Sequence, residues 1–404
     1  MLTVKTSAEA EQIIKDNFGA ISMPEESVDV LESVGRILAE DIKASEDVPG
    51  FNRSTVDGYA VCASDTFGCS ESIPALLDYK GEVKMGEAPK FSIGKYQCAY
   101  VPTGGELPEG ADAMVMIEYA EDYGDGTRAM LKPSAPGQHV TYKGDDVKCG
   151  EVVVPKGTMV EPRHVASMAA LGYGTVKVYR KPVIGVISTG DELVDITETP
   201  KGAEVRDINS FEICATLKKM GCDCKRYGIV RDDIPTLRAT IEDALATCDA
   251  VVTSGGSSVG VKDATFRVYD ELGAVLFHGI AIKPGKPTIA ANIDGKPAFG
   301  LPGHPLAAFY VFNIFVKPII NSMAGYSSKN ETVKATLMRA IPCNHGREEC
   351  VGIKLHETEA GLVAEPAFTK SGLISVLAKT DGYIRISRDC EGLSQGDEVE
   401  VELF

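Results

Sequence analysis

Between residues 182 and 324, short apolar runs alternate with amphipathic stretches, and this alternation constrains the fold more than any other feature of the sequence. The predicted strands are Val183–Ser188, Lys225–Val230, Ala250–Ser254 and Ala274–Ile282, and the predicted helices are Ser210–Met220, Thr236–Thr247, Ala264–Leu272 and Pro305–Met323. Such alternation is typical of a mostly parallel sheet covered by helices on both faces. The sequence therefore predicts a multidomain α/β plus β protein with a central parallel α/β domain.

A loop rich in glycine and serine, residues 254–263 (SGGSSVGVKD), connects one of these strands to the helix Ala264–Leu272. Backbone N–H groups approach an anion closely where glycine removes the Cβ, and a helix N-terminus favours negative charge. Asp263 at the end of the loop would repel a phosphate unless a divalent cation lay between them. The loop therefore indicates phosphate binding with Mg²⁺, with a plain strand-to-helix turn as the alternative, because short glycine motifs are weak evidence.

Polar loops also follow the other predicted strands, and in a parallel sheet these loops meet at the carboxyl edge, where ligands bind. Three carboxylates, Glu192, Asp232 and Asp263, could hold Mg²⁺ there. Lys283 and Lys286 could neutralise an anionic ligand. Each loop alone is compatible with a solvated connection, but together they indicate anion handling with Mg²⁺. The sequence contains no HExxH or Walker A motif, and the absence of HExxH argues against zinc hydrolysis.

The remaining segments predict three further domains. Near the N-terminus, Ser7 is a candidate N-cap for a helix Ala8–Phe18, and Ser27–Asp41 gives a second amphipathic, helical run. Short β-type segments fill residues 48–142, and residues 329–404 alternate in the manner of strands. We expect a helical/mixed linker domain (1–46 and 145–178, with a helix Glu161–Leu171), a β-rich insertion domain (47–144), the central α/β domain (179–328) and a C-terminal β-barrel domain (329–404).

Composition limits the partners and the compartment. The formal net charge of -17 argues against nonspecific binding to nucleic acid or anionic membranes. We find no apolar stretch of about 18 residues and no signal-peptide core at the N-terminus. The eleven cysteines occur without a CxxC pair, which favours reduced, mostly buried thiols. We therefore expect a cytoplasmic protein with no nucleic-acid or membrane partner.

Five motifs together resemble one family, the molybdopterin molybdenumtransferases, which comprises MoeA and the E domain of gephyrin. The motifs are residues 54–60 (STVDGYA), 188–193 (STGDEL), 254–260 (SGGSSVG) with Asp263, 283–287 (KPGKP) and 300–303 (GLPG). The resemblance implies an elongated four-domain subunit and a homodimer. The active cleft would lie between the α/β domain of one subunit and the β insertion of the other.

The implied reaction is Mg²⁺-dependent hydrolysis of adenylylated molybdopterin with insertion of molybdate into the dithiolene, giving molybdenum cofactor and AMP. The resemblance implies the catalytic positions Asp57, Thr103, Asp146, Glu192, Asp232, Asp263 and Lys283. Of these, Glu192, Asp232 and Asp263 would hold the metal. The positions implied to bind the cofactor are Ser254, Gly255, Gly256, Ser257, Gly260, Lys283, Lys286, Pro302, Gly303, His304 and Ser375.

The sequence departs from the family pattern at two places. His304 stands where many relatives have asparagine, and Gly279, after His278, stands where some carry a lysine. His304 could pack or cap a helix, or it could adjust the choice between molybdate and tungstate, whereas His278 is expected to be structural. The alternatives are thus a tungstate-preferring insertase, a catalytically silent binding or scaffold module of the same fold, and an unrelated Mg²⁺-dependent nucleotide hydrolase.

The implied reaction also predicts partners. We expect a separate molybdopterin adenylyltransferase upstream, and molybdoenzyme apo-proteins or their chaperones downstream.

Overall fold

The computed structural model describes residues 4–255, 264–326, 331–343, 346–359, 361–368 and 374–404. The chain forms two compact units. Unit 1 comprises Met1–Ala39, Gly157–Glu161 and Thr175–Phe404, and unit 2 comprises Glu40–Lys156 and Pro162–Gly174. The finer division into four domains stays a prediction.

The centre of unit 1 is a six-stranded sheet with the order β16-β13-β17-β21-β20-β18. Its strands are β13 (Val183–Thr189), β16 (Asp223–Val230), β17 (Ala250–Ser254), β18 (Ala274–His278), β20 (Ile289–Ile293) and β21 (Lys296–Leu301). Neighbouring strands from β16 to β21 are parallel, and β20 runs antiparallel to both β21 and β18. Five strands therefore point the same way, which confirms the predicted mostly parallel sheet.

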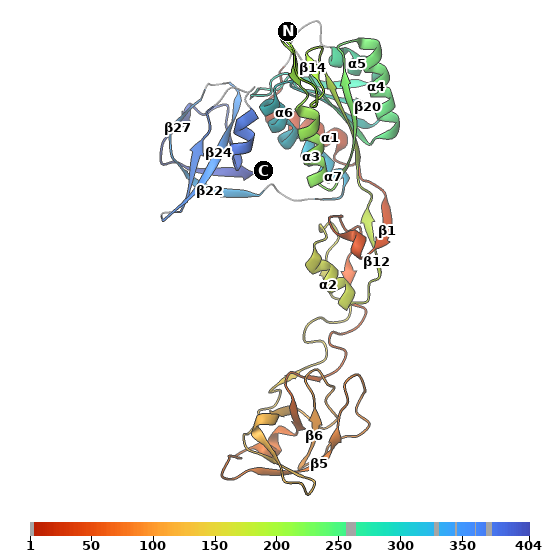
Figure 1. Cartoon of the computed structure of the whole chain (residues 1–404), viewed down its shortest axis with the longest axis vertical. Coiled ribbons are helices and arrows are strands. Elements are labelled where there is room, and N and C mark those ends of the chain that lie inside the picture. The colour runs from red at the N-terminus through yellow and green to blue at the C-terminus, as the bar shows by residue number, and fades with distance from the viewer. Residues whose placement is uncertain (1–3, 256–263, 327–330, 344–345, 360, 369–373) are drawn as a thin grey trace. The chain divides into compact units, whose positions relative to one another are not determined.

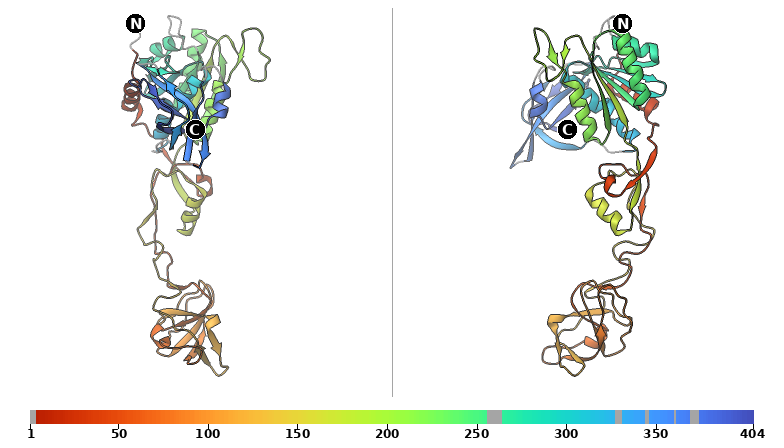
Figure 2. Two further views of the ribbon diagram at one scale, coloured as in Figure 1. Left: turned by 90° about the vertical axis from the view of Figure 1, so that its left-hand side faces the viewer. Right: turned by 45° about the vertical axis from the view of Figure 1, so that its right-hand side comes forward.

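Helices cover both faces of this sheet (Figures 1 and 2). The helices are α1 (Ser7–Phe18), α3 (Asn209–Lys219), α4 (Ile234–Thr247), α5 (Ala264–Leu272), α6 (Pro305–Val311) and α7 (Lys317–Met323). Ile213 of α3 and Phe18 of α1 belong to one apolar core, whereas Leu237 of α4 and Val268 of α5 belong to another. Two separate cores fit a sheet that is apolar on both faces.

The predicted strand Ala274–Ile282 is wrong in its second half. Strand β18 ends at His278, and Gly279 then adopts a φ of 112°, a conformation that favours glycine. The next two residues of strand, β19 (Ile282–Lys283), pair with β24 (Glu348–Thr358) of the C-terminal region instead. This break carries Lys283 from the α/β sheet to the barrel.

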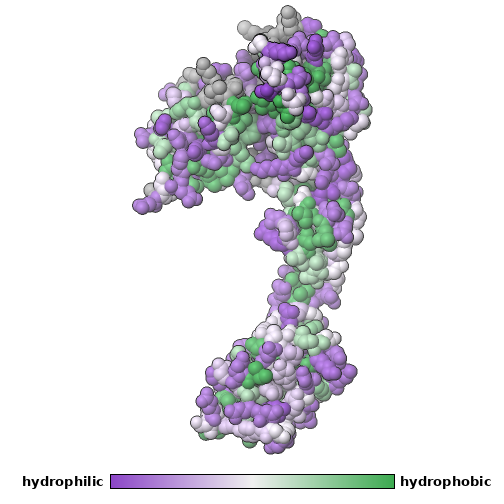
Figure 3. Space-filling model, in the orientation of Figure 1, coloured by the Kyte–Doolittle hydropathy of each residue, from purple (hydrophilic) through white to green (hydrophobic). Residues whose placement is uncertain are grey.

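Residues 305–323 form one helical run in which α6 and α7 flank a π-helical segment, Phe312–Val316. This run is long and apolar enough to cross a membrane, with a mean hydropathy of 1.4, so the expectation of no such stretch was wrong. However, 72% of it is buried inside the protein, as in the core helix of a globular domain. The face of both units visible in Figure 3 mixes hydrophilic and hydrophobic residues.

The N-terminal segment differs from its prediction in two respects. Helix α1 is capped by Thr6 rather than by Ser7, because Thr6 and Glu9 form a reciprocal capping box. The predicted helical run Ser27–Asp41 is wrong. Its first residues lie in β1 (Glu25–Asp29), which pairs antiparallel with β12 (Thr175–Tyr179), and a short 3₁₀ turn follows at Leu31–Ser33. Pairing with a strand remote in the sequence overrides the local pattern.

The C-terminal region forms the predicted barrel. Its strands are β22 (Thr332–Leu337), β24, β25 (Gly361–Pro366), β26 (Gly382–Ile386) and β28 (Glu398–Leu403). They pair in the order β24-β25-β22-β28-β26, and a pairing between β26 and β24 closes the ring. Leu337, Ile353 and Val401 fill its interior, so inward and outward residues alternate along the strands.

Unit 2 contains a second six-stranded sheet, with the order β7-β4-β6-β5-β9-β8. Its strands are β4 (Gly58–Val61), β5 (Ala75–Glu82), β6 (Gln97–Val101), β7 (Ala113–Met116), β8 (Ala120–Asp122) and β9 (Thr127–Met130). All pairings are antiparallel except β5 with β6. Two short pairs, β3 (Arg53–Ser54) with β10 (Val140–Thr141) and β2 (Ile42–Lys43) with β11 (Val152–Val154), and helix α2 (Pro162–Ala170) complete the unit.

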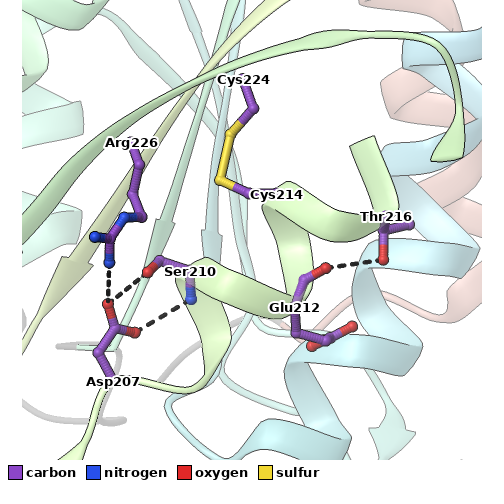
Figure 4. The surroundings of a disulfide bond; sticks show 7 residues. All are labelled: Asp207, Ser210, Glu212, Cys214, Thr216, Cys224 and Arg226. Atoms are coloured by element: carbon purple, nitrogen blue, oxygen red, sulfur yellow. Dashed lines mark hydrogen bonds and ion pairs between the residues drawn. A yellow bond between two sulfur atoms is a disulfide. The ribbon is translucent and has the colours of Figure 1, made fainter. Parts of the chain in front are cut away.

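The cysteines differ from the expectation of reduced thiols at one pair. Cys214 of α3 and Cys224 of β16 form a disulfide, which links this helix to the edge strand of the sheet (Figure 4). The other nine cysteines, all within the described residues, are free. The pair was missed because residues ten positions apart match no common cysteine motif.

Candidate active site

The carboxyl ends of the parallel strands lie next to one another at one edge of the central sheet. Thr189 at the end of β13 is in register with Val230 of β16, and Ser188 is in register with Ser254 of β17. Ser254 is in turn in register with Leu301 of β21. The loops that were predicted to meet therefore begin side by side.

The acidic side of this edge is built by the loops after β13 and β16. The Thr189 hydroxyl donates a 2.7 Å hydrogen bond to Oδ1 of Asp232. The backbone N–H of Asp232 faces Oδ1 of Asp191 at 3.4 Å. The exposed Glu192 folds back over Gly190, where a Cβ would come within 2.8 Å of its Oε2. Two of the three predicted metal-binding carboxylates thus lie on adjacent loops.

Asn209, the first residue of α3, lies at the centre of the edge. Its side chain is buried, and the residue is only 7% exposed. Its Nδ2 donates to Oγ of Ser254 at 2.7 Å and to the carbonyl oxygen of Gly303 at 2.9 Å. The Ser254 hydroxyl lies 3.4 Å from the carbonyl oxygen of Pro302. One side chain therefore holds together the loops after β17 and β21.

Gly255 follows Ser254 at a position that only glycine fits. Its φ is 99°, and a Cβ there would lie 1.9 Å from the carbonyl oxygen of Thr189. Its N–H points to the carbonyl oxygen of Leu301 at 3.3 Å. The start of the Gly/Ser loop is thus pressed between two neighbouring strand ends, which is the close backbone approach that glycine permits.

A buried carboxylate, Asp207, anchors the N-terminus of α3 (Figure 4). Its Oδ1 accepts hydrogen bonds from the Ser188 hydroxyl at 2.7 Å and from the Ser210 backbone N–H at 3.2 Å. Its Oδ2 lies 4.0 Å from a guanidinium nitrogen of Arg226. These contacts fix Asn209, two residues further on, relative to the end of β13.

The basic side of the edge carries Lys283 and Lys286. The ammonium group of Lys283 donates to Oε1 of Glu349 in β24 at 2.7 Å. The exposed Lys286 holds its loop through its backbone carbonyl oxygen, which accepts from the N–H groups of Ile280 and Thr288. The two lysines thus follow β18 on a loop that the barrel supports.

Histidine positions differ in their surroundings. His304 is the N-cap residue of α6, yet its exposed side chain makes no capping hydrogen bond, so it does not act as a cap. The ring of His278 stacks on Phe266, with ring centroids 4.7 Å apart. This contact agrees with a structural role for His278.

Ser375 is exposed on a short 3₁₀ turn, Ile374–Lys379.

Three predicted site residues belong to unit 2. Asp57 is exposed, and its Oδ1 accepts a 2.8 Å hydrogen bond from the backbone N–H of Thr103. This contact brings together two positions that are 46 residues apart in the sequence. Asp146 is also exposed, and its N–H bonds to the carbonyl oxygen of Val48.

Comparison with known proteins identifies the family. Residues 5–172 match the model of the MoeA N-terminal region (domains I and II), residues 185–322 match a probable molybdopterin binding domain, and residues 334–404 match the MoeA C-terminal region (domain IV). A putative molybdopterin biosynthesis protein of Methanocaldococcus jannaschii is 37% identical over 388 residues, which cover 93% of this chain and 92% of that protein. The chain belongs to the MoeA family.

Further relatives agree with this assignment. A molybdopterin molybdenumtransferase of Staphylococcus aureus is 33% identical over 385 residues, covering 95% of this chain and 92% of that protein. The crystal structure of a molybdopterin biosynthesis MoeA protein from Pyrococcus horikoshii is similar with a TM-score of 0.87 and 39% identity, and covers 99% of both chains. The resemblance inferred from the five motifs is therefore confirmed.

In this MoeA-family chain, the structure brings described site residues together within each of the two units. In unit 1 it brings together the loops of Glu192, Asp232, Ser254, Gly255, Pro302 and Gly303. In unit 2 it brings together Asp57 and Thr103. Gly256, Ser257, Gly260 and Asp263 lie outside the described residues.

Sequence reasoning missed Asn209, Asp207 and Glu349. The first two were detectable in principle, because an Asp-x-Asn sequence at the start of a predicted helix suits capping.

Magnesium, which the family resemblance implies, fits the chemistry of this edge. Asp232 and Glu192 supply carboxylate oxygens, the ligands that Mg²⁺ prefers, and the ion is often held by one or two carboxylates together with substrate phosphates. Within the described ranges, no cluster of three or more potential metal ligands is present. The third predicted ligand, Asp263, lies outside those ranges.

Proposed function

We propose that this protein is a molybdopterin molybdenumtransferase. It hydrolyses adenylylated molybdopterin in the presence of Mg²⁺, inserts molybdate into the dithiolene, and releases molybdenum cofactor and AMP. The observation that carries the proposal is the edge at which Asn209 joins the Ser254 and Gly303 loops beside Asp232. This edge combines the start of the Gly/Ser loop with carboxylates and lysines, the residue types that would bind an anionic ligand together with Mg²⁺.

Each group at the edge has a role in this reaction. Glu192 and Asp232 would hold Mg²⁺, which supplies charge stabilisation at the phosphoanhydride. Thr189 orients the Asp232 carboxylate through its hydroxyl. The Gly/Ser loop, residues 254–263, would bind the substrate's phosphate oxygens, and Lys283 would neutralise anionic charge as a point cation. The protein thereby positions the adenylate for attack by water.

Sharply chosen carboxylate variants test these roles. We expect Glu192→Gln and Asp232→Asn to abolish the formation of transferable molybdenum cofactor without unfolding the protein. Each substitution keeps the size of the side chain and removes only its negative charge. Glu198→Gln, an exposed residue on the following loop, is the matched control and keeps full activity. Full turnover in both site variants would contradict the assigned roles. Asp263→Asn extends the test to the Gly/Ser loop.

We further propose that the active protein is a homodimer in which Asp57 and Thr103 of one subunit complete the site of the other. Mixing Asp57→Asn and Asp232→Asn subunits tests this directly. Half of the randomly assorted dimers are mixed and carry one intact site of two, so activity returns to about a quarter of the wild-type value. If each site used only its own subunit's residues, no mixture would regain activity.

The tungstate-preferring insertase stays as a second candidate because His304 is exposed at the start of α6, where it can face an oxyanion. Competition between molybdate and tungstate separates the two. A silent scaffold would lack turnover with either oxyanion. We also propose a cytoplasmic location. We further propose an upstream adenylyltransferase as a partner, and co-purification with that enzyme would test this partnership.

A further inference from the structure

A cavity of about 380 Å³ lies within unit 1, between α6 and strand β24 of the barrel. It is lined by Lys283, Pro284, Leu306, Tyr310, Glu349, Cys350, Val351, Gly352, Ala367 and Phe368. Most of these side chains are apolar, and the polar groups come from Lys283, Tyr310 and Glu349. Of the residues assigned above to the reaction, the cavity contains only Lys283. Its size is in the range of small-molecule sites.

Tyr310 is the first reason to regard this cavity as a binding site. The residue is fully buried, and its hydroxyl has no hydrogen-bond partner among the described residues. The hydroxyl lies beside Gly352, where a Cβ would stand 3.1 Å from it. A buried hydroxyl without a partner weakens folding, so a ligand that bonds to it would satisfy an otherwise costly group.

Glu349 is the second reason. Its side chain is 15% exposed, and Oε1 accepts the 2.7 Å bond from Lys283. An ionised carboxylate only accepts hydrogen bonds, so this wall of the cavity selects a ligand edge that carries donors. Lys283 forms this ion pair and is the residue that the cavity shares with the reaction proposed above.

We propose that this cavity binds the pterin ring of the substrate, an inference that rests on the proposed function. Pro284, Leu306 and Val351 offer apolar surface to a flat bicyclic ring, and aromatic Phe368 lies among the lining residues. The pyrimidine edge of a pterin presents two adjacent N–H donors, which match the two oxygens of a carboxylate. The adenine ring of the substrate presents a donor beside an acceptor and matches less well. The Tyr310 hydroxyl bonds to a ring nitrogen or oxygen atom.

The test uses the full-length protein and the fluorescent compound pterin (2-amino-4-oxopteridine), whose anisotropy rises on binding. We expect wild-type protein to bind it without Mg²⁺ or molybdate. Tyr310→Phe should weaken binding about fivefold through one lost hydrogen bond while leaving thermal stability equal or higher. Ala367→Phe should abolish binding by filling the cavity.

Tyr383→Phe is the matched control. Tyr383 is also buried, but its hydroxyl donates to Glu402 at 2.8 Å, and it does not line the cavity. This variant should lose stability and keep its affinity for pterin. Absence of pterin binding to the wild type, equal binding by the Tyr310 and Ala367 variants, or displacement of pterin by adenine would overturn the proposal. Because the assay needs no turnover, failure of the insertase reaction with intact pterin binding would count against the proposed function alone.

Discussion

Glu212, in the first turn of α3, makes the stability of unit 1 depend on pH (Figure 4). Both of its carboxylate oxygens are buried, and neither has a partner among the described residues. Burial raises its pKa from the ordinary value of 4.5 to about 8. In the unfolded chain the group ionises near pH 4.5, whereas the folded protein keeps its proton to about pH 8.

The sign and the magnitude of the pH-dependent change in the free energy of unfolding follow from this difference in pKa. The stability that the neutral carboxyl contributes is fully present below pH 4.5 and is lost as the pH rises to about 8. The loss amounts to about 3 kcal/mol at pH 7 and about 5 kcal/mol above pH 8. Glu212→Gln removes the titration. The variant should therefore match the wild type at pH 4.5 and exceed its stability by these amounts at higher pH.

Hydrogen exchange of the slowest backbone amides in β13 and β17 measures this effect, because the protein has no tryptophan to report unfolding and the two units need not unfold together. The ratio of protection factors between variant and wild type should rise at least about 100-fold from pH 4.5 to pH 7. Glu198→Gln should leave the ratio constant. A constant ratio for Glu212→Gln would show that its carboxylate is stabilised in the folded state, and would refute the reasoning.

Three further variants test the site. Gly255→Ala should reduce insertion activity by about 100-fold or more, because its Cβ would lie 1.9 Å from the carbonyl oxygen of Thr189; activity within twofold of wild type would contradict this. Asn209→Leu should raise KM and lower kcat together, because two loops lose their shared donor, whereas a Glu198→Gln control should change neither. Lys283→Gln should weaken substrate binding by about 1 to 2 kcal/mol, and an unchanged KM would argue that Lys283 serves only Glu349.

Elements with a strong local pattern could be predicted from the sequence. The helix periodicity of Thr236–Thr247 and the strand alternation of Glu398–Leu403 matched the structure closely, because each element buries one face in a core and exposes the other. The mostly parallel sheet also followed from the alternation of strands with helices. The position of Ser254 and Gly255 at the sheet edge was thus foreseeable.

Elements defined by remote contacts could not be predicted. Strand β1 forms only because Glu25–Asp29 pairs with Thr175–Tyr179, which lies far along the chain. Ile282 left the predicted strand because β19 pairs with the barrel rather than with the central sheet. Local sequence carries no record of either partner.

The missed site residues share this cause. Asn209 lies 45 residues from Ser254 and 94 from Gly303, so its role as their shared donor exists only after folding. Glu349 meets Lys283 across 66 residues. Motifs identified the loops of the candidate site, whereas the contacts by which side chains hold these loops were visible only in three dimensions.

The release of AMP from adenylylated molybdopterin by purified protein and Mg²⁺ is the most direct test of the central claim. It should be measured without oxyanion, with molybdate and with tungstate. The account predicts release that depends on molybdate, together with cofactor that activates a molybdoenzyme apo-protein. No release under any of these conditions from the folded protein would contradict it, and release with tungstate alone would overturn the choice of molybdate.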